Sequence, residues 1–266
     1  MTAPGGPRAD GDHSFLVLAY GTSPYLSGCV ASLVAQSRPS RIVIATSTPC
    51  AEIAGVAREN GLSLLVNPQR KGIASDWNFA FRAAETRYVT LAHQDDVYAP
   101  GFLSATLDLF AERPDGAVCF TGYGEIDDEG RPRSSRISRA KHLIEGLALG
   151  RRRVVKGWPL RLFLSFGNPL PCSSVTFDRA QLTTFAFSDA YASNLDWDAW
   201  WRLHDEGRVF LRAPGRLVGR RHNPLTETSR LIQEGRRQTE DAQMFARIWP
   251  SPLDRAIGSL YAGSYR

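Results

Sequence analysis

Two adjacent carboxylates, Asp95 and Asp96, stand in the segment HQDDVY, directly after the strand-like run YVTLA. Adjacent carboxylates at the carboxyl end of a strand repel each other unless a cation or hydrogen-bond donors hold them. A hard cation such as Mg²⁺ prefers oxygen ligands of this kind. The alternative is an Asp pair that caps the next helix, because Asp is common at helix starts. The spacing therefore predicts a metal site or a helix cap.

A second candidate is the loop in NPQRKGIASDWN, which carries Arg70 and Lys71 and leads into a helix after Gly72. Backbone N–H groups at the start of a helix attract anions. Together with the two cationic side chains, they would suit a phosphate or a sugar.

Two further candidates lie later in the chain. In NLDWDAWWRL, Asp196 and Asp198 stand among three tryptophans at helical spacing, which is more typical of a buried core than of a ligand platform. A carboxylate held against aromatic surface has its charged form disfavoured and can act as a general base. In GRRHNPLTETS, Arg220, Arg221 and His222 would suit a metal–phosphate site, although a lone histidine is usually structural.

Several familiar enzyme sites are absent from the sequence. There is no GxxxxGK[ST] phosphate loop, no GxGxxG and no GxSxG nucleophile elbow, which disfavours kinases, Rossmann oxidoreductases and α/β-hydrolases. The four cysteines form no CxxC pair, so we expect buried reduced thiols and no zinc site or redox motif.

The candidate residues must be positioned by the elements around them, and residues 14–123 alternate between strand-like and helix-like segments. The strand-like runs HSFLVLAYG, RIVIAT, LSLLVN and RYVTLAH are each followed by a segment with apolar residues at helical spacing. Such alternation predicts a mostly parallel sheet with helices on both faces. Ligands of such sheets bind where the carboxyl ends of the strands meet the loops.

After Tyr123 the pattern becomes mixed and more basic. Between Arg131 and Lys156 there are nine Lys or Arg residues against Glu145 alone, a local charge of +8, whereas the whole chain carries 32 − 27 = +5. Three interpretations are open: a solvated flexible linker, a lid over a diphosphate, or a surface for an anionic acceptor or peripheral membrane contact. We expect no nucleic-acid partner, because aromatic residues are not interleaved with the charges.

The chain has 266 residues, of which 43% are hydrophobic and 22% charged, and this is the composition of an ordinary globular protein. No apolar run approaches the roughly 18 residues of a spanning helix, and residues 1–13 lack the apolar stretch of a signal peptide. We therefore expect a cytoplasmic protein.

Taken together, the motifs LAYG, GIASDWNFAF, HQDD, DWDAW and RRH resemble, in order and spacing, a family 2 glycosyltransferase over about residues 14–250. The resemblance implies the GT-A fold, an α/β architecture with a mostly parallel central sheet flanked by helices and a Rossmann-like N-terminal half. It also implies an inverting, nucleotide-sugar-dependent transferase that uses Mg²⁺ or Mn²⁺. In such enzymes the cation bridges the donor diphosphate, and one carboxylate deprotonates the acceptor hydroxyl.

The resemblance also implies roles for individual residues, with Asp196 as the catalytic base and Asp96 and His222 as metal ligands. The implied contacts to the nucleotide sugar are Ala19, Tyr20, Gly21, Ser47, Arg70, Lys71, Asp76, Asp95 and Arg221. The family often has acidic residues after the second strand, where this chain has ATSTPC, so the donor base stays open. Gln94 stands at the first position of the DxD-type motif, so either Asp95 or Asp96 can be the main metal ligand.

The implied organisation is one domain in two halves. Its parts are a disordered tail (1–13), a nucleotide-sugar-binding half (14–125), a basic linker or lid (126–160), an acceptor-binding and catalytic half (161–250) and a C-terminal tail (251–266). The expected donor is a nucleoside-diphosphate sugar, with a UDP-sugar favoured. The expected acceptor is a small molecule, a lipid-linked molecule or a protein. The loop from Asn168 to Ser174 either lines the acceptor cleft or is a structural turn.

Two other functions stay open. A nucleotidyltransferase can use a related sheet and a metal-binding carboxylate pair, and it would release pyrophosphate from a nucleoside triphosphate. A nucleotide-sugar-binding module without turnover would agree with the missing acidic pair after the second strand.

Overall fold

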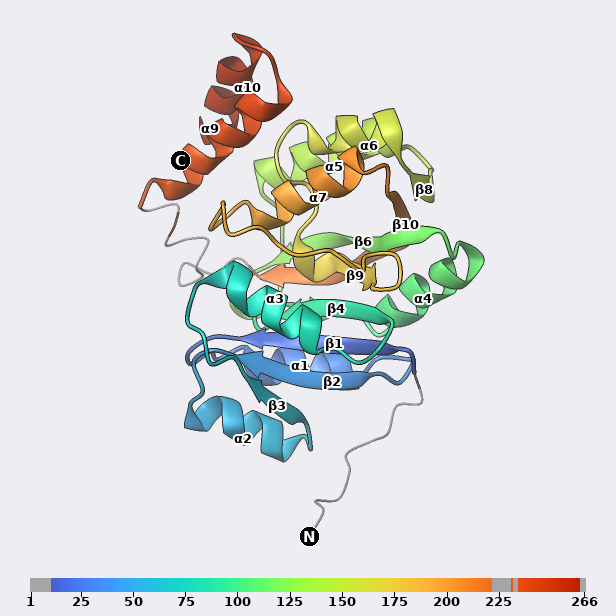
Figure 1. Cartoon of the computed structure of the whole chain (residues 1–266), viewed down its shortest axis with the longest axis vertical. Helices are drawn as coiled ribbons and strands as arrows, with labels where there is room; N and C mark the ends of the chain where they lie inside the picture. The colour runs from blue at the N-terminus through green and yellow to red at the C-terminus, as the bar shows by residue number, and fades with distance from the viewer. Residues whose placement is uncertain (1–10, 222–230, 232–233, 264–266) are drawn as a thin grey trace.

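The computed structural model describes residues 11–221, 231 and 234–263, which form a central sheet with helices on both faces (Figure 1). The strands are β1 (His13–Ala19), β2 (Arg41–Thr46), β3 (Ser63–Val66), β4 (Tyr88–His93), β5 (Val97–Tyr98), β6 (Gly116–Ile126), β7 (Pro132–Arg133), β8 (Val154–Val155), β9 (Val175–Asp178) and β10 (Val209–Arg221). The helices are α1 (Leu26–Val34), α2 (Ala51–Glu59), α3 (Ile73–Ala83), α4 (Phe102–Glu112), α5 (Arg136–Leu149), α6 (Gly157–Leu164), the 3₁₀ turn η1 (Cys172–Ser174), α7 (Leu195–Asp205), α9 (Arg236–Ile248) and α10 (Leu253–Ala262).

The sheet is mostly parallel, which confirms the prediction from the sequence. Its strand order is β3-β2-β1-β4-β9-β6-β10-β5, with β7 paired to β6 and β8 to β10. The parallel strands β1, β2 and β4 are mostly buried, as expected for strands covered on both faces. β9 runs antiparallel between β4 and β6, so the second half of the chain contributes a strand to the middle of the same sheet.

Most of the helices bury residues on one face against this sheet or against one another. In α1 the buried residues Leu26, Cys29, Val30 and Leu33 follow the helical period. α3 begins after Gly72, whose φ of 94° is a conformation that favours glycine. This glycine lets the basic loop after β3 turn directly into α3.

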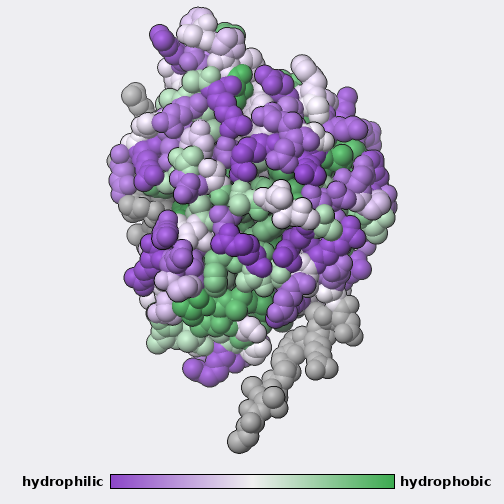
Figure 2. Space-filling view, viewed as in Figure 1, coloured by the Kyte–Doolittle hydropathy of each residue, from purple (hydrophilic) through white to green (hydrophobic). Residues whose placement is uncertain are grey.

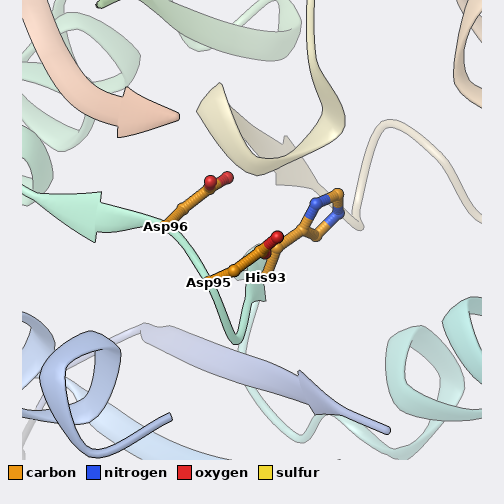
Figure 3. Close-up of side chains that lie close together, drawn as sticks. All are labelled: His93, Asp95 and Asp96. Atoms are coloured by element: carbon orange, nitrogen blue, oxygen red, sulfur yellow. The ribbon is translucent and has the colours of Figure 1, made fainter. Parts of the chain in front are cut away.

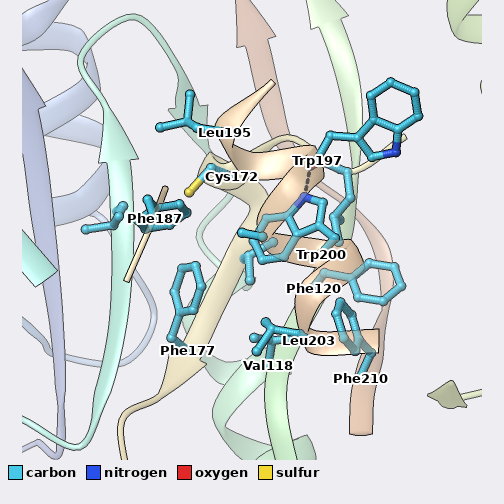
Figure 4. Close-up of a cluster of buried hydrophobic side chains, with 14 of the residues drawn as sticks. Val118, Phe120, Cys172, Phe177, Phe187, Leu195, Trp197, Trp200, Leu203 and Phe210 are labelled. Carbon is cyan, nitrogen blue, oxygen red and sulfur yellow. Dashed lines mark hydrogen bonds between the residues drawn. The ribbon is translucent and has the colours of Figure 1, made fainter. Parts of the chain in front are cut away.

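The main hydrophobic core lies between the sheet and α7 (Figure 4). Trp197 and Trp200 of α7 are fully buried, and the Trp200 ring stacks on Phe177 of β9 with ring centres 5.8 Å apart. Their indole N–H groups donate to the carbonyl oxygens of Leu164 and Leu170, at 2.9 and 2.8 Å. These tryptophans are therefore core residues and not a ligand platform.

The basic segment 126–160 contains regular structure where the sequence suggested a linker or lid. α5 begins with a capping box formed by Ser135 and Ser138, and it packs against α6. Lys141 of α5 donates to the carbonyl oxygen of Asn168 at 2.8 Å, and β8 pairs with β10. These contacts tie the basic segment to the folded body.

The two expected tails also contain ordered elements among the described residues. β1 begins at His13, whose fully buried imidazole contacts the hydroxyls of Ser40 and Thr90 at 2.7 and 3.0 Å. α10 occupies much of the expected C-terminal tail and packs against α9.

The surface is mixed in character. On the side shown in Figure 2 it is largely hydrophilic, and hydrophobic residues gather in the lower half, where Figure 1 places β2 and β3. Val66 of β3 is 46% exposed. Among the described residues, none of the helices is both long and apolar enough to cross a membrane.

Candidate active site

The turn between β4 and β5 brings three potential metal ligands together. Each of His93, Asp95 and Asp96 offers a ligand atom, and these atoms lie within 4.8 Å of one another. The three side chains project from the same turn at the carboxyl end of β4 (Figure 3). The strand itself is apolar and buried, so its pairing in the sheet fixes where the turn begins.

Asp96 is buried and only half satisfied. Its Oδ1 accepts a hydrogen bond from the backbone N–H of Arg221 at 3.0 Å, whereas its Oδ2 has no hydrogen-bond partner of normal geometry among the described residues. Burial, and then the charge of Asp95, raise the pKa of Asp96 to about 6, although His93, Ser173 and Arg220 act in the opposite direction. An unpartnered carboxylate inside a protein is strongly disfavoured unless a cation balances it.

These observations fit a divalent cation. The buried Nε2 of His93, like Oδ2 of Asp96, lacks a hydrogen-bond partner in the described part of the chain. Two carboxylates and one imidazole suit Mg²⁺ or Mn²⁺. The sequence pointed to Asp95 and Asp96 but not to His93, whose signal was its position at the end of the apolar strand. His222, the other expected metal ligand, lies outside the described residues.

Arg221, an expected nucleotide-sugar contact, is engaged with the protein itself. Its guanidinium donates to the carbonyl oxygens of Asp95 at 3.0 Å and Asp128 at 2.8 Å, and also to that of Asp127. The same group lies 4.3 Å from the ring centre of Tyr25. Since the side chain is also buried, these contacts of Arg221 hold the turn in place.

The first loop, Ala19 to Gly21, is joined to the same turn by Gln94. The Gln94 side chain accepts from the N–H of Tyr20 and donates to its carbonyl oxygen, both at 3.1 Å. The N–H of Gly21 donates to Thr48 Oγ1 at 2.7 Å, while the Tyr20 side chain is 63% exposed. Gln94 therefore links the first loop to the carboxylate turn, and we call this pair of hydrogen bonds the latch. The latch joins segments that follow two different strands, so no local sequence pattern indicates it.

A second polar cluster lies after β2 and β3. The carboxylate of Asp76 accepts hydrogen bonds from the Ser47 hydroxyl at 2.7 Å and from the Asn67 amide at 2.8 Å. The Arg70 guanidinium donates to the carbonyl oxygen of Ser47 at 2.9 Å. Lys71 is exposed, and its side chain forms no hydrogen bond or ion pair with the described residues. The structure thus brings three of the expected donor contacts together and adds Asn67.

The turn η1 separates the metal-ligand cluster from Asp196. Ser173 lies close enough to Asp96 to lower its pKa, and the charge of Asp196 adds to the burial that raises the pKa of the Cys172 thiol. The loop that the sequence placed either at the acceptor cleft or in a structural turn therefore lies between the two sets of carboxylates.

The two carboxylates of α7 have different surroundings. Asp198 is paired with Arg202 at 2.8 Å and with Arg247 at 2.7 Å. Asp196, 9% exposed in the first turn of the helix, accepts from the N–H of Trp197 at 2.9 Å and pairs with no cation of the described chain. Of these two carboxylates, Asp196 is therefore the one that no cation of the described residues neutralises.

Solved structures of other proteins share the fold of this chain. The structure of S. aureus TarS 1-349 in complex with UDP-GlcNAc matches with a TM-score of 0.63 at 14% identity, over 92% of this chain and 70% of that chain. The mannosyltransferase PcManGT from Pyrobaculum calidifontis, in complex with GDP-Man and Mn²⁺, matches with a TM-score of 0.63 at 16% identity, over 97% of this chain and 71% of that chain. No curated protein matches the chain. At these identities the two structures show a shared fold, the GT-A fold.

The sequence itself matches the model of glycosyl transferase family 2 over residues 14–168, which is more than half of the chain. This match covers the first loop, the Asp76 cluster and the carboxylate turn. The chain therefore belongs to glycosyl transferase family 2, and the protein is a glycosyltransferase.

Proposed function

We propose that the protein transfers a sugar, with inversion, from a nucleoside-diphosphate sugar to an acceptor hydroxyl. The observation that carries this proposal is the cluster of His93, Asp95 and Asp96, in which two buried ligand atoms have no hydrogen-bond partner among the described residues. The similar structures support it, because one is a complex with UDP-GlcNAc and the other a complex with GDP-Man and Mn²⁺. The family assignment favours glycosyl transfer over nucleotidyl transfer.

The carboxylate turn would hold a divalent cation, Mg²⁺ or Mn²⁺, through His93, Asp95 and Asp96. When bound, such a cation stabilises the negative charge that develops on a departing diphosphate. Arg221 would act as a positioning residue, because its hydrogen bonds to the carbonyl oxygens around the turn fix where the carboxylates lie.

The nucleoside would bind between the first loop and the Asp76 cluster. Tyr20 offers an exposed ring for stacking, and Ser47, Asn67 and Asp76 offer hydrogen-bonding groups. Arg70 extends from the same loop as Lys71, so both can add positive charge near the donor.

Asp196 would accept the proton of the acceptor hydroxyl as that oxygen attacks the anomeric carbon. A general base needs a carboxylate within hydrogen-bond reach of the hydroxyl and free of a competing cation. Asp196 meets the second condition, and η1 lies between it and the carboxylate turn. The loop that contains η1 would then line the acceptor cleft.

Asp196→Asn tests the proposed base, with Asp198→Asn as its matched control on the same helix. We expect Asp196→Asn to lower transfer about 10²–10⁴-fold while donor binding is retained. Asp198→Asn should lower thermal stability, because it weakens the pairs with Arg202 and Arg247, but leave transfer measurable. Normal turnover in Asp196→Asn would remove the base assignment.

A thermal-shift screen of UDP, GDP, CDP, dTDP and ADP, each with and without Mn²⁺ or Mg²⁺, tests the donor. A bound ligand raises the unfolding temperature according to its affinity. Metal-dependent stabilisation by one nucleotide would identify the donor base. A response to triphosphates alone would contradict the proposal, and stabilisation by a nucleotide sugar without hydrolysis or transfer would point to a binding module.

A further inference from the structure

A cavity of about 430 Å³ lies between α5 and the β10 edge of the sheet, and we call it the arginine pocket. It contains three of the nine cationic residues of the basic segment, together with two arginines of β10, and the proposed reaction uses none of them. Its charged lining residues are Arg151, Arg152, Arg153, Arg212, Arg216 and Glu145.

The pocket exists because the outer edge of β10 is covered only in part. β8 pairs with Phe210 and Leu211, and β5 pairs with Val218 and Gly219. The register of β10 against β6 shifts on both sides of Arg216. Among the described residues no outer strand pairs with the stretch between these two contacts, so the sheet edge opens there and α5 forms the opposite wall.

The charges that line the pocket are only partly balanced by the residues that the structure describes. Arg212 pairs with Glu145 at 2.7 Å, and Arg153 pairs with Glu112 at 2.9 Å. By contrast, Arg151 and Arg216 are exposed and form no ion pair with any residue that the structure describes. The like charges repel one another, and an anion between them would relieve that repulsion.

Two further features favour an oxyanion as the ligand. Arg152 donates to the carbonyl oxygen of Leu149 at 3.3 Å, a long contact that leaves most of its N–H groups unused. His142 also lines the pocket, and its buried Nε2 lacks a hydrogen-bond partner in the described part of the chain. Arginine side chains bind phosphate, sulfate and carboxylate groups through paired, charge-assisted hydrogen bonds.

The arginine pocket is separate from the metal-ligand cluster but lies on the same strand. The backbone N–H of Arg221 binds Asp96, and Arg216 precedes it by five residues on β10. Five residues of strand span roughly 16 Å. An anionic group in the pocket would therefore belong to a part of a ligand several groups away from the reacting hydroxyl.

We propose that the arginine pocket binds an oxyanion carried by the acceptor, a phosphate, sulfate or carboxylate group, and so selects acidic acceptors. The assignment to the acceptor rests on the proposed glycosyl transfer, whereas the binding of an oxyanion does not. Of the three interpretations open for the basic segment, this proposal adopts the anionic acceptor.

Calorimetric titration of the whole protein with inorganic phosphate tests the binding. The variant Arg151→Ala/Arg216→Ala removes two of the lining cations that form no ion pair with described residues, and Arg58→Ala, on the exposed end of α2, is the matched control. We expect the double variant to bind phosphate about tenfold or more weakly, because charge-assisted hydrogen bonds are lost, and the control to bind like the wild type. Equal phosphate affinity in wild type and double variant would overturn the proposal.

Kinetics with a matched pair of acceptor probes, a hexose 6-phosphate glycoside and the same glycoside without phosphate, test the link to the acceptor. The double variant should raise KM for the phosphorylated probe about tenfold and leave donor hydrolysis and KM for the neutral probe unchanged. An equal effect on both probes would overturn the acceptor assignment. If the wild type hydrolyses no donor at all, the proposed function fails, and the phosphate titration alone decides whether the pocket binds an anion.

Discussion

The two ends of β4 differ in whether their buried polar groups have hydrogen-bond partners. Toward its amino end, Thr90 contacts Thr176 Oγ1 at 2.8 Å and His13 Nε2 at 3.0 Å, and His13 Nδ1 contacts Ser40 Oγ at 2.7 Å. At the carboxyl end, His93 Nε2 is buried without a hydrogen-bond partner among the described residues.

From this difference we expect the amino end of β4 to contribute to stability and its carboxyl end to contribute to function. A buried polar group that lacks its hydrogen bond costs about 1–3 kcal/mol. The amino end avoids this cost by joining polar groups of three neighbouring strands. At the carboxyl end this cost is present, and we expect a bound ligand to offset it by supplying the missing contacts. Substitutions at the two ends should therefore affect different properties.

The largest effect is expected at the carboxyl end, from Asp96→Asn. Loss of this carboxylate should lower transfer about 10²–10³-fold and abolish stabilisation by Mn²⁺ with a nucleotide. The metal-free protein should become more stable, because a neutral amide replaces a buried, half-satisfied carboxylate. Transfer assays and thermal unfolding with and without Mn²⁺ measure these changes.

Asp108→Asn, on the exposed surface of α4, is the control and should leave both properties unchanged. An Asp96→Asn protein that is less stable and fully active would mean that both ends of the strand serve stability.

The amino end should give a large stability effect from Asp178→Asn. The buried Asp178 carboxylate binds the Arg87 guanidinium through three contacts between 2.7 and 3.2 Å. Because the amide loses the ion pair, the free energy of unfolding should fall by about 2 kcal/mol. Urea denaturation measures the loss, and transfer below the unfolding temperature should be unchanged. A fall in transfer with no fall in stability would reverse the comparison.

The two ends should also respond to pH with opposite signs. Burial lowers the pKa of His13 to about 3, so below its unfolded pKa of about 6.5 only the unfolded state binds this proton, and stability falls as the pH falls. From pH 7 to pH 5 this amounts to about 2 kcal/mol. The raised pKa of Asp96 acts the other way, since the folded state takes up a proton before the unfolded state does and gains stability as the pH falls.

Urea denaturation of the metal-free protein at both pH values, on wild type, His13→Gln and Asp96→Asn, separates the two contributions. His13→Gln should lose less stability than the wild type on acidification, and Asp96→Asn should lose more. Identical pH dependence in all three proteins would contradict both assignments.

The smallest effect is expected from Gln94→Ala, which opens the latch between the first loop and the carboxylate turn. Two hydrogen bonds at a partly exposed position should contribute about 1 kcal/mol to donor binding, or roughly a fivefold change in affinity. Titration with the donor nucleotide measures it. Gln181→Ala, whose amide donates to the Pro114 carbonyl oxygen at 3.2 Å away from the turn, is the control. Equal donor affinity in both variants would remove the latch role.

The architecture was largely predictable from local patterns. The buried runs of β1, β2 and β4 and the helical period of α1 lie where their apolar residues repeat, because burial of those faces drives the pairing. The same local patterns did not indicate α10, because a helix of ten residues is marginal in isolation and depends on packing, here against α9.

The candidate site was predictable in part. Asp95 and Asp96 were recognisable as adjacent carboxylates after a strand, and Asp196 was recognisable as a carboxylate among aromatic residues. His93 and Gln94 belong to the same motif, but their different roles depend on which atoms of other elements lie nearby.

Residue types and their periods were thus sufficient to indicate a parallel α/β sheet with carboxylates at its functional edge. Tertiary structure alone decided that Asp198 is paired with two arginines while Asp196 is not, and that Arg221 holds the turn. The reason is physical: hydrogen bonds and ion pairs depend on distances of about 3 Å between atoms far apart in the chain. A pattern along the sequence specifies which face of an element is buried, but not which residues of other elements contact that face.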